Sequence, residues 1–129
     1  MTLKTLKEWI KARIPPNTPV YSGCIDAQKE CNIGLYERDR GQYIQAIGGI
    51  DNNTYETRRY SLLVHWNKNY DQSEIVAGEI FNIFKKSTVI DGKNAFFRLL
   101  VSAPVPMGKD DKGIFEFVIN FDMTVNKEE

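Results

Sequence analysis

The 129-residue sequence has one histidine, two cysteines and no net charge, since 17 basic residues balance 17 acidic ones. This balance argues against a protein whose main work is to neutralise phosphates. One histidine, His65, and two cysteines, Cys24 and Cys31, without Cys-x-x-Cys spacing do not indicate a zinc site. No apolar run approaches the roughly 18–20 residues of a membrane span. We therefore expect no membrane segment, no metal and no cofactor.

What the chain does contain is typical of a folded domain. Its hydrophobic content of 42% and aromatic content of 12% are high enough to build a core. At roughly 100–200 residues per domain, the length predicts one domain over residues 1–129. The N-terminal segment alternates lysines with apolar residues and lacks the apolar core of a signal peptide, so we expect an intracellular product.

Two segments have the apolar periodicity of amphipathic helices. The first spans residues 3–14 and ends before two consecutive prolines, and Thr5 and Glu8 have the spacing of a capping box. The second runs from about 71 to 86, with Asp71 as its expected N-cap. Its apolar face is wider than a single stripe, which indicates packing on more than one side.

The other regular segments have the composition or alternation of strands. The expected strands are 20–25, 32–36, 55–66, 95–102 and 114–125. A long loop is predicted at residues 37–54, in which only 43–47 could form a strand. A connection of this length more often has a function or is mobile than serves only to join two elements. A charged, glycine-flanked loop is expected at 107–113.

This order of elements predicts the fold class. It is neither a strict strand–helix alternation nor an all-strand pattern. We expect an α+β domain with a mostly antiparallel sheet and two helices packed against it.

The polar groups do not indicate an active site. His65 lies within an expected strand, and no serine or cysteine beside a carboxylate suggests a catalytic triad. Asp110 and Asp111 occupy a loop without the glutamate spacing of a calcium site, which favours a solvated turn. We therefore expect no catalytic residue and no enzyme.

Four segments, taken together and in order, resemble the small tail-terminator proteins, or minor capsid proteins, of long-tailed bacteriophages. They are LKEWIKARI, VYSGCIDAQKECNIGLY, IGGIDNNTYETRRYSLLVHWNKNYDQSE and PVPMGKDDKGIFEFVINFDM. The resemblance implies a virion protein, present in the host cytoplasm during assembly, that sits at the head–tail junction. It implies a ring, usually a hexamer, that ends tail-tube polymerisation and contacts the tube protein and the head connector. DNA would only pass through the lumen.

Such a ring uses two different surfaces on each subunit. The candidate partner or ring contacts lie in the 37–54 loop, in the charged loop and on the second face of the last strand; they are Arg38, Arg40, Tyr43, Ile44, Ile47, Asp110, Asp111, Ile114 and Val118. Three alternatives are a head-closure or tail-completion connector, an unrelated interaction module, and a small hydrolase that uses His65 with the 37–54 loop.

Overall fold

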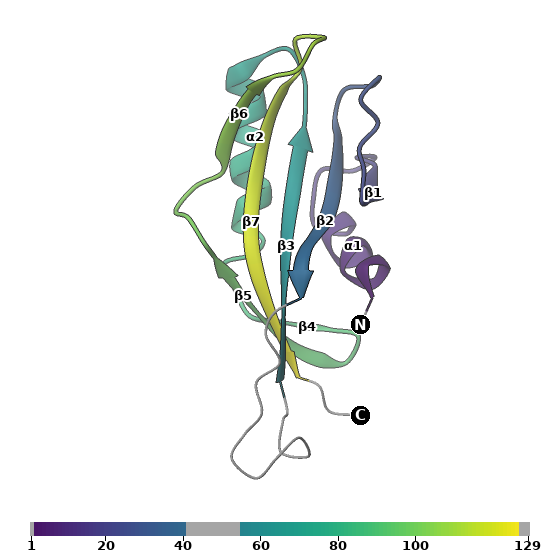
Figure 1. Ribbon diagram of the computed structural model, residues 1–129, viewed down its shortest axis with the longest axis vertical. Coiled ribbons are helices and arrows are strands. Elements are labelled where there is room, and N and C mark those ends of the chain that lie inside the picture. The colour runs from purple at the N-terminus through teal and green to yellow at the C-terminus, as the bar shows by residue number, and fades with distance from the viewer. Residues whose placement is uncertain (1, 41–54, 127–129) are drawn as a thin grey trace.

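The computed structural model describes residues 2–40 and 55–126 of the chain. Two helices and seven strands form one α+β unit, which confirms the predicted fold class (Figure 1). In chain order the elements are α1 (Leu3–Lys11), β1 (Val20–Ser22), β2 (Asn32–Arg40), β3 (Tyr55–His65), α2 (Tyr70–Asn82), β4 (Thr88–Ile90), β5 (Lys93–Leu99), β6 (Val105–Lys109) and β7 (Phe115–Asn126).

The strands form a single sheet in the order β1-β2-β3-β7-β5-β4, with β6 pairing beside β5 along the same edge of β7. Only β1 and β2 pair in parallel, and the other described pairs are antiparallel. The long central strands β3 and β7 pair along their whole length, from Tyr55 opposite Asn126 to His65 opposite Glu116. The hairpin of β4 and β5 turns at Asp91 and Gly92, which both have positive φ as a tight hairpin requires.

Helix α1 begins one turn earlier than the capping-box prediction placed it. Thr2 is the N-cap, and its hydroxyl accepts a hydrogen bond from the backbone N–H of Thr5 at 3.3 Å. The predicted cap, Thr5, therefore lies inside the helix. The helix ends at Lys11 rather than at Ile14, although Ile14 is still buried in the core beyond the last turn.

Helix α2 differs from its prediction at both ends. Asn69, not Asp71, is the N-cap, and its side-chain oxygen accepts a hydrogen bond from the backbone N–H of Gln72 at 3.1 Å. The helix ends at Asn82, four residues before the predicted end, and a turn follows. Neither of the two described helices is long and apolar enough to cross a membrane.

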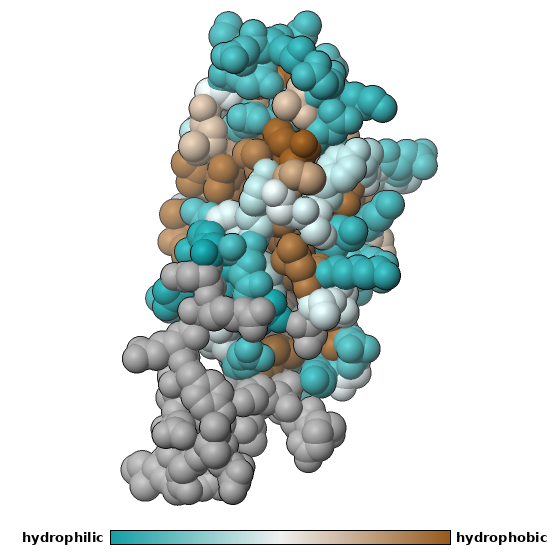
Figure 2. Space-filling model, turned by 45° about the vertical axis from the view of Figure 1, so that its right-hand side comes forward, coloured by the Kyte–Doolittle hydropathy of each residue, from teal (hydrophilic) through white to brown (hydrophobic). Residues whose placement is uncertain are grey.

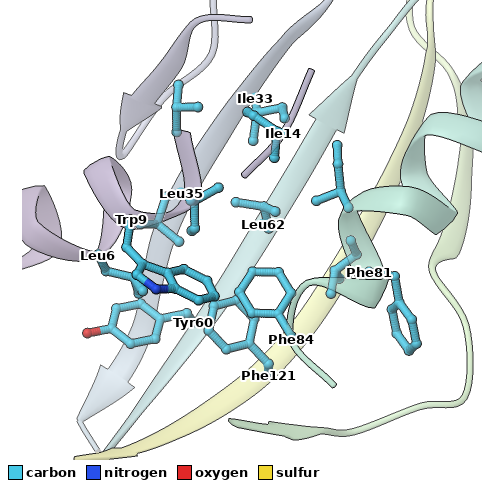
Figure 3. Packing of buried hydrophobic residues seen from close by; sticks show 14 of the residues in the cluster. Leu6, Trp9, Ile14, Ile33, Leu35, Tyr60, Leu62, Phe81, Phe84 and Phe121 are labelled. Atoms are coloured by element: carbon cyan, nitrogen blue, oxygen red, sulfur yellow. The ribbon is translucent and has the colours of Figure 1, made fainter. Parts of the chain in front are cut away.

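Both helices pack on the same face of the sheet. Figure 3 shows the core between them, with Leu6 and Trp9 of α1 close to Tyr60, Leu62 and Phe121 of the sheet. Alternation along β7 places its odd-numbered residues from Phe117 to Val125 in this core. The opposite, helix-free face of the sheet carries the even-numbered residues of β7 and the residues of β3 that pair with them.

Two predicted loops are partly strand. Strand β2 continues to Arg40, so residues 37–40 belong to the sheet, and residues 41–54 of the predicted loop lie outside the described residues. Strand β6 occupies Val105–Lys109 and so includes residues 107–109 of the predicted 107–113 loop. Proline is compatible with a strand at the edge of a sheet, and β6, which contains Pro106, is exposed along its whole length.

Candidate functional site: a contact surface

The candidate contact residues lie at opposite ends of the sheet. Arg40 is the last residue of β2 and pairs with Arg58, whereas Asp110 and Asp111 follow β6 near His65. Seven residues of β3 separate Arg58 from His65, or roughly 23 Å of strand. Three further candidates, Tyr43, Ile44 and Ile47, lie outside the described residues. The structure therefore divides the candidates into two groups rather than one site.

Arg38 binds across the helix-free face of the sheet. It sits at the β2 bulge, and its guanidinium reaches over β3 to β7. Nε donates to the carbonyl of Tyr60 at 3.1 Å, and Nη2 donates to the carbonyl of Phe121 at 3.3 Å and to Oδ1 of Asp122 at 3.1 Å. With about a third of its side chain exposed, Arg38 combines this structural role with a solvent-facing charge.

A buried ion pair holds the same end of the sheet on the helix side. Arg58 donates to both carboxylate oxygens of Glu37, at 2.9 and 2.8 Å, and only 6% of its side chain is exposed. The hydrogen bonds to Glu37 raise the pKa of Arg58 above its usual value, against the effect of desolvation. This bidentate geometry fixes β2 against β3 directly before the point where β2 ends.

The two apolar candidates on β7 have different surroundings. Ile114, directly before β7, is 2% exposed, so it packs inside its own chain. We therefore do not include Ile114 in the proposed contact surface. Val118 is half-buried on the helix-free face, opposite Val105 of β6. Only Val118 therefore remains available at the surface.

An exposed apolar strip follows the outer edge of β7, and sequence analysis did not select it. Phe96 pairs with Thr124 and Val105 with Val118, while the N–H of Leu100 bonds the carbonyl of Asn120. The strip consists of Phe96, Leu100, Val101, Val105 and Met107, which are 37–59% exposed. Figure 2 shows apolar groups lying among polar ones on one face of the molecule. The sequence predicts an apolar strand at 95–102, but an apolar composition alone does not distinguish a covered face from an open one.

His65 is buried and hydrogen-bonded. Its side chain is 0% exposed, and Nδ1 lies 2.8 Å from Oε2 of Glu116 on the neighbouring strand. His65 lies at the C-terminal end of β3, and Tyr55 lies at the other end. Tyr55 is the first described residue after the 41–54 segment. Ten residues, or roughly 33 Å of strand, separate it from His65. Tyr55 therefore lies far from His65, and residues 41–54 of the segment that a hydrolase would use lie outside the described residues.

The two cysteines are free thiols. Cys24 is exposed and Cys31 is half-buried. Burial, with a smaller contribution from the charge of Glu30, raises the pKa of Cys31. Neither residue belongs to the groups of candidate contacts described above.

The fold and surface define the class: a small α+β protein whose single sheet has one face packed under helices and another face free for contacts. A family model described as bacteriophage tail terminator protein matches residues 29–127. Because this match covers most of the chain, the protein belongs to the bacteriophage tail terminator family, as the sequence resemblance indicated. It is thus a structural protein and a virion component of a class that is not enzymatic. No curated protein matches the chain.

Proposed function

We propose that the protein forms a ring, most simply a hexamer, on the head-proximal end of the phage tail tube. The ring stops addition of further tube subunits and presents a surface that joins the tail to the head connector, while DNA passes through its lumen. The observation that carries this proposal is the family match over residues 29–127. A head-closure or tail-completion connector is the second candidate, because such a protein would need the same kind of contact surfaces.

The distribution of surface groups supports a ring with unlike contacts. A head-to-tail ring joins two different patches of each subunit, and the two ends of this sheet differ in chemistry. One end carries Arg38, which pairs with Asp122, and Arg40 at the end of β2. The other end carries a charged turn in which Lys109 and Lys112 flank Asp110 and Asp111. The apolar strip along β7 adds a surface whose burial against another subunit would stabilise the assembly.

We place one subunit contact on the apolar strip together with Val118. Met107 is the most exposed member of the strip, at 59%. The other candidate contacts, Arg38, Arg40, Asp110 and Asp111 with Tyr43, Ile44 and Ile47, belong to the surfaces for the neighbouring subunit, the tube protein or the connector.

Electron microscopy of the purified protein, alone and mixed with tail tubes, tests the proposal. We expect rings, either free or at one end of each tube, and tails of abnormal length in phage that lack the protein. A protein that stays monomeric, does not bind tubes and does not affect tail length would refute the terminator role. Binding to filled heads but not to isolated tails would instead favour a head-closure connector.

A pair of variants tests the proposed contact. Met107→Asp places a charge on the apolar strip, and Ile75→Asp places the same charge on an exposed residue of α2, which is 62% exposed. We expect Met107→Asp to abolish rings while the monomer stays folded, and Ile75→Asp to leave rings intact. The reverse result would move the contact to α2.

A further inference from the structure

Three side chains with metal-binding atoms converge at one end of the sheet. His65 ends β3, Glu116 is the second residue of β7, and Asp110 lies in the turn between β6 and β7. Nδ1 of His65 is 2.8 Å from Oε2 of Glu116 and 3.9 Å from Oδ2 of Asp110. One such atom from each residue lies within 4.8 Å of the other two. Sequence analysis missed this cluster because the three residues are far apart along the chain.

The backbone holds each of the three groups in place. Strand pairing puts His65 directly opposite Glu116 on the helix-free face. In the turn, Oδ1 of Asp110 accepts hydrogen bonds from the backbone N–H groups of Lys112 and Ile114, each at 2.9 Å. The second oxygen, Oδ2, therefore points toward His65. A site that is already ordered loses little entropy when a ligand binds.

The charges of the cluster favour a cation. Two carboxylates face one imidazole, and each carboxylate side chain is 21% exposed, so that water can complete a coordination shell. The hydrogen bond from the backbone of Ile114 contributes most to a lowered pKa of Asp110; desolvation opposes it, and the hydrogen bond from Lys112 and the charges of His65 and Lys112 lower the pKa further.

The distances fit a small first-row ion. Zinc binds nitrogen and carboxylate oxygen at about 2.0–2.2 Å, which places tetrahedral ligand atoms about 3.3 Å apart. The two distances from Nδ1, 2.8 and 3.9 Å, lie on either side of that value. All three ligand atoms lie within 4.8 Å of one another, so each pair is within roughly 1.5 Å of the tetrahedral spacing. An imidazole ligand favours zinc over magnesium or calcium, which prefer oxygen ligands alone.

We propose that His65, Asp110 and Glu116 bind one Zn²⁺ ion through Nδ1 and the two carboxylates, with water in the remaining position. The ion would replace the hydrogen bond between Nδ1 and Glu116, and the ring proton would move to Nε2, which is buried without a hydrogen-bond partner among the described residues. The ion would tie the β6–β7 turn to the end of β3 and so stiffen this end of the sheet. The site is contained within one chain and does not depend on ring assembly.

Zinc binding by the untagged protein tests the proposal, measured by isothermal titration calorimetry and by thermal unfolding. We expect one ion per chain and a rise in Tm of roughly 8–10 °C at a free zinc concentration 100 times Kd. Asp110→Asn keeps the oxygen that accepts the two backbone hydrogen bonds but replaces the free ligand atom with NH₂. Glu116→Gln makes the same change on β7. Each variant should weaken binding at least tenfold.

Asp71, exposed on the first turn of α2, supplies the matched control, and Asp71→Asn should bind zinc like the unmodified protein. Co²⁺ as a spectroscopic probe should give d–d absorption without thiolate charge-transfer bands. Absence of binding at millimolar zinc would overturn the proposal. It would also fail if Asp110→Asn and Glu116→Gln both bound zinc unchanged, or if thiolate bands placed the ion on the cysteines.

Discussion

Phe84, just beyond the end of α2, provides the sharpest test of where α2 packs. The width of the apolar face of this helix is compatible with either a core or a ring contact, and the structure places Phe84 in the core at 1% exposure. Its ring stacks on Phe121 with centroids 4.3 Å apart and meets Phe97 edge-on at 5.1 Å. Trp9 of α1 lies 6.0 Å away, so this one ring joins both helices to the sheet (Figure 3).

Phe84→Ala should lower the free energy of unfolding by about 3–5 kcal/mol, the usual cost of truncating a buried phenylalanine. We expect the upper part of this range, because three aromatic neighbours lose a partner and such pairs contribute about 0.5–1.5 kcal/mol beyond their buried area. At about 4 °C per kcal/mol for a domain of this size, Tm should fall by roughly 16–20 °C.

Urea unfolding of the monomer, followed by circular dichroism, measures this loss. Ile75→Ala is the matched control, because Ile75 lies on α2 and is 62% exposed. The free energy of unfolding of this variant should differ from that of the unmodified protein by less than about 0.5 kcal/mol. The reasoning is refuted if Phe84→Ala leaves monomer stability within about 1 kcal/mol of the unmodified protein while rings are lost. That result would make Phe84 a contact between subunits.

Three further predictions use the same unfolding assay or a labelling experiment. Gly34→Ala should destabilise the protein by about 1–3 kcal/mol, because the added Cβ would collide with the carbonyl of Cys24 and lie 2.7 Å from Cγ2 of Ile25; Gly78→Ala, with nothing within 4 Å, should be neutral or stabilising. Glu37→Gln should cost about 1–3 kcal/mol, because it removes the charge that faces buried Arg58, whereas exposed Glu79→Gln should cost almost nothing. Iodoacetamide at pH 8 should alkylate exposed Cys24 before Cys31, because burial raises the pKa of Cys31 and leaves less thiolate; mass spectrometry of the peptides would detect the opposite order.

The elements that sequence analysis predicted best are those with a strong local period. Strand β3 was expected at 55–66 and occupies Tyr55–His65, and the apolar side of β7 is the side that is buried. The caps were predicted less well. Asn69 was passed over for Asp71 as the N-cap of α2, although both residue types cap helices, because the choice depends on where the preceding loop places the chain.

The sequence by itself determined the fold class, both helices, most strands and, through resemblance, the family. It could not determine which residues meet across the sheet. His65, Asp110 and Glu116 converge only because β3 pairs with β7 and the β6–β7 turn folds back beside them. Likewise, the sequence predicts an apolar strand at 95–102, but it does not show that Phe96, Leu100 and Val101 lie exposed beside the outer edge of β7. Periodicity is a property of neighbouring residues, whereas coverage and convergence depend on pairing between segments that are distant along the chain.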